Sequence, residues 1–306
     1  MRFEKWQALG NDYVIVEQRD LPWELTEERI RRICAPHTGV GSDGILLLSE
    51  TEERGMVASL RIFNPDGSEA ELSGNGAREA IMYLHHHNWT SQRQFSIRTV
   101  AGEIRPTILD ETHCRVDMGR ASLASARDFP SGDREGRGEV EGLAFQFVSI
   151  GNPQCAIRVL DPDTVDLAAI GPRIERSELF PNRTNVSFWA PLDDATIRAR
   201  IFERGAGETL SSGTGATGAA VAHVLRGGAS PVTVRLDGGE LEVEVDESLH
   251  VDLTGWALPV YAGELSPELT VDVDESLHVD LTGWAVPVYA GELSAELLAA
   301  LSHPSG

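Results

Sequence analysis

Two stretches of the chain, 139 residues apart, share one pattern of apolar and polar positions. In each stretch an apolar strand-like segment leads through a glycine-rich turn into Ser-Gly-x-Gly-Ala, and an apolar helix-like segment follows. Nine of the twenty positions in 61–80 match those in 200–219 without a gap. Chance rarely provides such agreement in a region of mixed composition. The pattern therefore predicts two related halves.

Helices are predicted directly after both turns. The segment 77–87 has a broad apolar surface, and 216–226 is apolar almost all round and is followed by two glycines that would end it. A helix of the second kind has no polar face, so it must be buried. A third helix, amphipathic and peripheral, is predicted from an N-cap at Thr26 to a stop before Pro36.

Short alternating segments dominate the rest of the chain and predict strands. The segments 232–236 and 241–245 flank Asp-Gly-Gly, which is typical of a β-hairpin. Residues 122–142 are polar and rich in Gly, Ser, Asp and Arg, which predicts a loop. The pattern as a whole indicates an α+β protein in which many strands surround one buried helix, twice.

A second repeat has a different character. Residues 243–270 recur at 271–298 with 24 of 28 positions identical. A solenoid normally needs three or more units, so this is a recent or artificial duplication. The first copy continues from the predicted hairpin and is expected to fill the native position. The surplus copy, followed by a tail at 299–306, is expected to form an exposed appendage or strand pair; alternatively the copies compete for one place or exchange between protomers.

The charge restricts the partners. The net charge is −22, and Lys5 is the only lysine, so a nucleic-acid partner is not expected. The surplus copy contributes six acidic residues and no lysine or arginine. No apolar run has the length of a membrane span or a signal peptide, which predicts a cytoplasmic protein without a membrane partner. The length of 306 residues and the 41% hydrophobic content suit two globular domains.

Cys34, Cys114 and Cys155 are odd in number and widely spaced. They form no C-x-x-C pair, so neither a disulfide framework nor a metal site is predicted. We expect them to be small buried hydrophobic residues.

Ser73 and Ser212 stand where the two repeated helices should begin. The first turn of a helix leaves backbone N–H groups without internal acceptors, and the helix dipole is positive there. Such a terminus can hold an anion. If the halves face each other, two hydroxyls and two sets of amides converge on one small carboxylate.

Seven sequence blocks, in order, give the chain a resemblance to diaminopimelate epimerases from Met1 to about residue 265. These blocks are Ala8-Leu9-Gly10-Asn11-Asp12, Gly39-Val40-Gly41-Ser42-Asp43-Gly44, Arg61-Ile62-Phe63-Asn64-Pro65-Asp66-Gly67-Ser68, Gly74-Asn75-Gly76-Ala77-Arg78, Gly151-Asn152-Pro153, Asn185-Val186 and Glu203-Arg204-Gly205-Ala206-Gly207-Glu208-Thr209.

The resemblance implies two similar domains, each a mixed sheet rolled into a barrel-like layer around a central helix, with the active site in the cleft between them. We expect a first domain at 1–118, completed by a C-terminal strand from about 256–270, and a second at 119–255. The resemblance also implies interconversion of LL- and meso-diaminopimelate without a cofactor or metal, by two bases on opposite sides of the α-carbon. A homodimer is a further expectation from the family.

The resemblance also implies the site residues. Ser73 and Ser212 occupy the two catalytic positions. The backbone N–H groups of the helix-opening turns would bind the substrate carboxylate. The predicted substrate-binding residues are Asn11, Asn64, Gly74, Asn75, Asn152, Asn185, Glu203, Arg204, Gly213 and Thr214. Gln154 and Glu203 are candidates for tuning the bases, whereas Glu69 and Glu208 could equally be structural.

The catalytic positions depart from the family, which carries cysteine at both. A thiol titrates near pH 8.5, whereas a serine hydroxyl needs an adjacent base, and the sequence reveals none. Gln154 stands where the family usually has histidine, and His85, His86 and His87 are expected to be solvated at a helix end. The form with two serines is therefore expected to be impaired or inactive.

Three functional readings remain open at this stage. The first is a diaminopimelate-type epimerase, natural or with engineered Cys→Ser changes. The second is an isomerase or dehydratase of the same fold that acts on another amino acid, such as hydroxyproline. The third is a protein that binds an amino acid without catalysis. A soluble scaffold without a site is disfavoured by the paired clusters.

Overall fold

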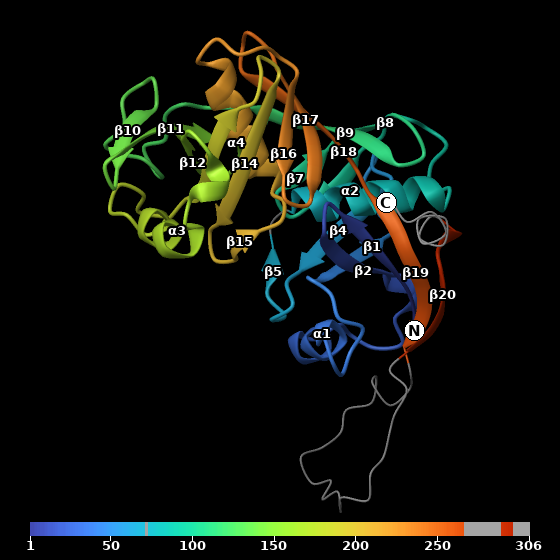
Figure 1. Ribbon diagram of the computed structural model, residues 1–306. Helices are drawn as coiled ribbons and strands as arrows, with labels where there is room; N and C mark the ends of the chain where they lie inside the picture. Colours follow the sequence, from blue (N-terminus) through green and yellow to red (C-terminus); the bar gives the residue numbers. More distant parts are fainter. Residues whose placement is uncertain (71–72, 266–288, 296–306) are drawn as a thin grey trace, which may run out of the picture. The chain divides into compact units, whose positions relative to one another are not determined.

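The computed structural model describes residues 1–70, 73–265 and 289–295, which form two compact units (Figure 1). The first unit comprises residues 1–8 and 12–105 together with the described residues from 257 onward. The second comprises residues 9–11 and 106–256. Each unit contains its own large mixed sheet.

The first unit is built on a sheet with the strand order β20-β19-β1-β2-β3-β4-β6-β7, and β5 pairs with β4 at the side. Its strands are β1 Arg2–Ala8, β2 Asn11–Glu17, β3 Ile45–Ser49, β4 Ala58–Phe63, β5 Glu69–Ala70, β6 Ile97–Thr99, β7 Gly102–Ile104, β19 Leu258–Leu265 and β20 Tyr289–Leu293. Its helices are the 3₁₀ turn η1 Gln18–Asp20, α1 Glu27–Cys34 and α2 Gly74–His86.

The second unit has the strand order β10-β11-β12-β13-β14-β16-β17-β18-β9-β8, and β15 pairs with β14. Its strands are β8 Pro106–Ile108, β9 His113–Arg120, β10 Arg137–Val140, β11 Leu143–Ser149, β12 Pro153–Arg158, β13 Asn185–Pro191, β14 Thr196–Glu203, β15 Gly207–Thr209, β16 Val232–Leu236, β17 Gly239–Val245 and β18 His250–Trp256. Its helices are η2 Pro162–Thr164, α3 Leu167–Glu175 and α4 Gly213–Val224.

The two sheets repeat one topology. The run β1-β2-β3-β4-β6-β7 corresponds to β11-β12-β13-β14-β16-β17. Parallel pairing occurs at the same two steps of each run, β2–β3 and β4–β6 in one and β12–β13 and β14–β16 in the other. The predicted α+β class with two similar halves is confirmed. The strand orders run as open paths, so closure of either sheet into a barrel stays a prediction.

A small helix covers one face of each sheet. In the first unit, α1 begins at the N-cap Thr26, as predicted, and its Ile30, Ile33 and Cys34 pack in one apolar cluster with Val14 and other residues of β2 and β3. In the second unit, Leu167 and Ile174 of α3 belong to a cluster with Phe145, Phe147 and Phe188. Each helix therefore completes an apolar core that it shares with the strands of its own unit.

The longer helices follow the predicted turns, but each begins about three residues earlier than its apolar pattern does. α4 is buried at ten of its twelve residues, as its composition requires, and it contacts β11 to β14 and β16 to β18. Its small residues allow close approach to the sheet. A Cβ at Gly215 would lie 2.7 Å from Ile201 Cδ1, and one at Gly218 would lie 2.8 Å from Gln154 Cβ.

The boundary between the units lies after residue 105, earlier than the expected boundary at 118. The reason is strand pairing: β8 pairs with β9, and β9 pairs with β18 of the second unit. The expected loop at 122–142 is irregular over most of its length, but it includes β10, which pairs with β11. The alternating pattern of this four-residue strand was too short to recognise.

The first copy of the C-terminal repeat supplies the last three residues of β17, all of β18 and all of β19. Of the surplus copy, residues 271–288 and 296–298 lie outside the described residues, as does the tail at 299–306. Its described part contains β20, which pairs antiparallel with β19. The surplus copy thus contributes one strand beside the first copy, and its expected form as an appendage or strand pair stays a prediction.

The three cysteines are buried and free, as predicted. Burial raises the pKa of the Cys34 thiol to about 11. Among the described residues, no helix is both long and apolar enough to cross a membrane.

Two ionisable side chains are enclosed in the core of the first unit. Arg78 and Glu79, both on α2, are fully buried. Neither oxygen of the Glu79 carboxyl makes a regular hydrogen bond to the described residues. Burial raises the pKa of Glu79 well above its ordinary value, and the positive charge of Arg78 opposes this shift without overcoming it. The fold therefore favours a neutral Glu79.

We expect Glu79→Gln to raise the melting temperature at pH 8 and to change it much less near pH 5. The stabilising contribution of the protonated carboxyl is fully present below its unfolded pKa of about 4.3 and is lost as the pH rises through the raised folded pKa. Glutamine keeps a neutral group at every pH. Calorimetry of both proteins across this range measures the difference, and the exposed Glu52→Gln is the control. An equal effect at both pH values would contradict titration of Glu79.

Candidate active site

Ser73 and Ser212 are the N-cap residues of α2 and α4. The Ser73 Oγ accepts a hydrogen bond from the backbone N–H of Gly76 at 3.1 Å, and the Ser212 Oγ accepts one from Gly215 at 3.2 Å. Both serines have extended backbone conformations, as an N-cap requires. Each hydroxyl is thereby fixed beside the opening amides of its helix, whose first N–H groups have no intrahelical acceptor.

The second partner of Ser73 is a phenol. Tyr13, on β2, donates its O–H to the Ser73 Oγ at 3.2 Å. Tyr13 is buried, whereas Ser73 is half-buried. The Ser73 oxygen therefore accepts two hydrogen bonds, one from a backbone amide and one from a side chain 60 residues away.

The second partner of Ser212 is a carboxyl. The Ser212 hydroxyl lies close enough to the Glu203 side chain, at the end of β14, to lower the pKa of that carboxyl. Thr209 donates its own hydroxyl to Glu203 Oε1 at 2.8 Å. Burial raises the pKa of Glu203 above its ordinary value, although the two hydroxyls oppose the shift. A potential base thus stands beside Ser212: the sequence predicts Glu203 as a tuning residue, and the structure places it where it could accept a proton from this hydroxyl.

The amide side chains predicted to bind substrate in the first unit make local contacts. Asn64 donates from Nδ2 to the Ser68 Oγ at 3.0 Å, within a turn. Asn75 accepts at Oδ1 from the Arg78 guanidinium at 2.5 Å, one helical turn further on. Asn11 opens β2 but groups with the second unit.

Several predicted residues of the second unit fall into two groups of neighbours. Asn152 donates to the Thr214 Oγ1 at 3.2 Å, so it lies against the first turn of α4. Gln154 donates to Asn152 Oδ1 at 2.6 Å, which fixes the orientation of that amide. Gln154 therefore acts on Asn152, and the described residues show no hydrogen bond from it to Ser212.

The other pair is Asn185 and Arg204. Asn185 Oδ1 accepts from the backbone N–H of Arg204 at 2.7 Å. The Arg204 side chain is exposed, and it donates to the backbone carbonyl of Asn182 at 3.0 Å. Within the described part of the chain it forms no ion pair, so its guanidinium is available for a carboxylate.

Glu69 and Glu208 have the same structural role in the two halves. Glu69 forms a bidentate ion pair with Arg61 across the β4–β5 pair. The Arg61 Nε donates to Glu69 Oε1 at 2.8 Å, and the Arg61 Nη2 donates to Glu69 Oε2 at 2.9 Å. Glu208 pairs with Arg200 across β14–β15. Each carboxyl thus stabilises the turn between two paired strands that precedes its serine. It does so by an ion pair with arginine and not by a hydrogen bond to the helix-opening amides.

The three histidines at the end of α2 lie a full helix length away from Ser73. His85 and His86 are half-buried, and His87 is exposed. His87 contacts Glu4 with 2.8 Å between Nε2 and Oε1, and this bond raises the pKa of His87. The His86 ring packs edge-on against Trp6, with 5.1 Å between centroids.

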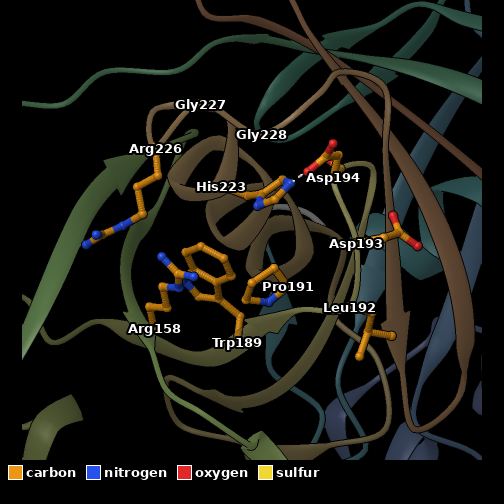
Figure 2. A pocket seen from close by; sticks show the side chains of 10 residues that line it. All are labelled: Arg158, Trp189, Pro191, Leu192, Asp193, Asp194, His223, Arg226, Gly227 and Gly228. Atoms are coloured by element: carbon orange, nitrogen blue, oxygen red, sulfur yellow. Dashed lines mark hydrogen bonds between the residues drawn. The ribbon is translucent and has the colours of Figure 1, made fainter.

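A hollow of about 350 Å³ lies in the second unit at the end of α4 opposite Ser212. Figure 2 shows its two arginines, Arg158 and Arg226, on one side of His223 and its two aspartates, Asp193 and Asp194, on the other. The twelve residues of α4 separate this hollow from Ser212. It is therefore not part of the predicted acid/base site.

One group of side chains has a composition that could hold a metal ion. Asp117 on β9 and His250 and Asp252 on β18 bring their ligand atoms within 4.8 Å of one another. His250 already pairs with Asp117 at 3.0 Å, and Asp117 is exposed. Paired, partly exposed groups of this kind are ordinary surface features, so no metal role follows.

Comparison with known proteins decides the family. The sequence model of the diaminopimelate epimerase family matches residues 3–124 and 146–257. The chain belongs to the diaminopimelate epimerase family. It is 42% identical over 275 residues to diaminopimelate epimerase 2 of a Nostoc species, covering 87% of this chain and 96% of that protein. It is 39% identical over 272 residues to the diaminopimelate epimerase of Aromatoleum aromaticum, covering 87% and 98%.

Solved structures extend the fold beyond this family. A probable proline racemase from Agrobacterium radiobacter, with bound carbonate, matches with a TM-score of 0.63 at 16% identity, covering 87% of this chain and 93% of that one. A hydroxyproline epimerase from Agrobacterium vitis, with bound trans-4-hydroxy-L-proline, matches with a TM-score of 0.61 at 14% identity, covering 86% and 91%. At these identities the likeness concerns the fold.

We expect Ser73→Ala and Ser212→Ala each to lower the free energy of unfolding by about 1 kcal/mol through loss of the N-cap bond. The loss should be larger for Ser73, because its removal also takes the acceptor of the buried Tyr13 O–H. Urea denaturation measures both effects. Ser91→Ala, at an exposed position outside any helix or strand, is the matched control. Equal stability of all three variants would show that the caps contribute nothing.

Proposed function

We propose that this chain carries the cofactor-independent, two-base site of its family and acts at the α-carbon of diaminopimelate, with Ser73 and Ser212 in the two catalytic positions. One observation carries the proposal. Two N-cap hydroxyls, at equivalent places in two repeated halves, each stand beside the amides that open a buried helix. The relatives that match over most of their length are diaminopimelate epimerases.

The reaction needs two acid/base groups on opposite sides of one carbon. One group removes the α-proton while the other delivers a proton to the opposite face, and negative charge grows on the substrate carboxylate between these events. The N–H groups of Gly74, Asn75, Gly213 and Thr214 would stabilise that charge. The proposal requires the two turns to face each other across a gap the width of one substrate carbon.

Side chains near the turns would select the substrate. The guanidinium of Arg204 can bind a carboxylate with two parallel hydrogen bonds. The amide of Asn152, held by Gln154 against Thr214, presents a fixed polar group beside the first turn of α4. Asn11, Asn64 and Asn185 would contact the ammonium and the distal groups of the substrate.

Serine at both catalytic positions limits the chemistry. A serine hydroxyl is far less acidic than a thiol and needs a neighbouring base. Ser212 has Glu203, whose raised pKa makes it a usable proton acceptor, whereas Ser73 has the O–H of Tyr13. Proton transfer is therefore better supported on the Ser212 side. Because inversion requires both sides, we infer that the form with two serines epimerises poorly or not at all.

Two alternatives remain testable in the same experiment. The structural likeness to proline racemase and hydroxyproline epimerase folds allows a substrate of the proline type. An intact anion site without effective bases would make the chain an amino-acid binding protein. Each alternative predicts a different pattern of deuterium exchange among the substrates.

We expect the double variant Ser73→Cys/Ser212→Cys to raise exchange of the α-hydrogen of diaminopimelate in D₂O by about 10²-fold or more. Cysteine near a helix N-terminus supplies thiolate and thiol at neutral pH. Mass spectrometry follows deuterium entry into LL- and meso-diaminopimelate, L-proline and trans-4-hydroxy-L-proline. The single variants should exchange without efficient inversion, because each restores one side.

The control is Ser91→Cys, which adds a thiol at an exposed position. If the folded double variant exchanges no faster than the parent, the assignment of Ser73 and Ser212 fails. Exchange with a proline substrate alone would replace the proposed substrate. Calorimetric binding of diaminopimelate to the parent, without exchange in either protein, would identify a binding protein.

A further inference from the structure

The hollow at the end of α4 carries charges of both signs. Two arginines and two aspartates line it, with the arginines on one side of His223 and the aspartates on the other (Figure 2): Arg158, Arg226, Asp193 and Asp194. All four side chains are exposed. Within the described part of the chain, none of them forms an ion pair with another of the four or with any other residue. The hollow thus holds two separate groups of opposite charge.

Unpaired arginines are a minority in this protein. The sequence has 48 acidic and 26 basic residues, and most arginines of the described chain form ion pairs with Asp or Glu. Arg158 and Arg226 border one hollow and have no such partner among the described residues. Their guanidinium groups can therefore bind a carboxylate with paired hydrogen bonds.

The lining also has an apolar part. Trp189 of β13 is 1% exposed, and the guanidinium carbon of Arg158 lies 5.8 Å from the centroid of its ring. The indole N–H of Trp189 has no acceptor among the described residues, so this wall contains a donor that the protein leaves unused. Leu192 is 52% exposed and adds apolar surface beside Asp193. An alkyl chain therefore has apolar surface to contact within the hollow.

Hydrogen bonds hold the aspartate side of the hollow in place. The backbone carbonyl of Asp194 accepts from the His223 Nε2 at 2.9 Å and from the N–H of Ala229 at 2.8 Å. The Asp193 Oδ1 accepts from the N–H of Ala195 at 2.9 Å, within the turn between β13 and β14. The end of α4 and this turn are thus joined directly. A site that is formed before the ligand arrives spends less free energy on ordering.

We propose that this hollow binds a small zwitterion whose carboxylate and ammonium groups are separated by an apolar chain, as in a linear ω-amino acid. Arg158 and Arg226 bind the carboxylate, and Asp193 and Asp194 bind the ammonium. The volume of about 350 Å³ lies within the range of known small-molecule sites. The proposal goes beyond the proposed function and does not depend on it, because the hollow lies at the end of α4 opposite Ser212.

The arrangement of charges favours a zwitterion over a ligand with one charge. The formal charges of the two arginines and the two aspartates cancel. A simple anion is attracted by the arginines but repelled by the aspartates, and a simple cation meets the reverse arrangement. A ligand that carries both charges is attracted on both sides. Selection against ligands with a single charge is therefore part of the site.

A binding series tests this selection in the full chain. The probes are 4-aminobutanoate, 6-aminohexanoate and 8-aminooctanoate, each compared with the carboxylate and the amine of the same chain length. We expect at least one zwitterion to bind about tenfold or more tightly than both of its analogues in calorimetric titration. It should also shift the indole N–H resonance of Trp189 in ¹⁵N–¹H spectra, where Trp189→Phe identifies the peak. No measurable binding in the series, or equal binding of an analogue, would overturn the proposal.

Charge-removing variants then locate the ligand. We expect Arg158→Gln/Arg226→Gln, and separately Asp194→Asn, to weaken binding of the zwitterion about tenfold or more. The matched control is Arg54→Gln, at an exposed position of the first unit, and it should keep full affinity. Thermal unfolding verifies that every variant is folded.

A last variant separates the hollow from the proposed active site. Arg204→Gln should keep full affinity for the zwitterion, because Arg204 does not line the hollow. Affinity lost in Arg204→Gln would place the ligand at the proposed active site and overturn the inference. Full affinity in Arg158→Gln/Arg226→Gln would overturn it as well. These measurements follow binding and not exchange at an α-carbon, so their failure is separate from failure of the proposed function.

Discussion

The hydrogen bond from a backbone N–H to a serine oxygen three residues earlier is the interaction on which both halves of the molecule depend. It ends the preceding turn, starts the buried helix and fixes the hydroxyl beside the helix-opening amides at Ser73 and Ser212. Serine is among the best N-cap residues. A side chain that would be a poor acid or base can therefore occupy each of the two proposed catalytic positions without disturbing the fold.

The two units share one topology, but the side chains next to the two serines differ. The topology, the covering helices and the Arg–Glu pairs recur in both units. The partners of the two serines do not recur, since Tyr13 serves one and Glu203 the other. Two bases that act on opposite faces of one carbon need not be chemically alike.

The C-terminal duplication changed the edge of a sheet without changing its core. The first copy keeps β19 paired with β1, and the second adds β20 outside it. A strand next to its own duplicate has a partner that is matched in length and sequence from the start. Because edge strands invite pairing, a duplication that covers its own edge is readily tolerated.

The sequence by itself determined the two related halves, the buried character of α4, the N-cap positions of both serines and the family. These features depend on local pattern or on long matches along the chain, and both can be read without coordinates. Only the tertiary structure decided that Glu203 stands beside Ser212, that Tyr13 reaches Ser73 across 60 residues, that the first unit ends after residue 105 and that β20 lies on β19. Such contacts depend on which strands pair and in which register. Registers join segments far apart in the chain, and no local pattern specifies them.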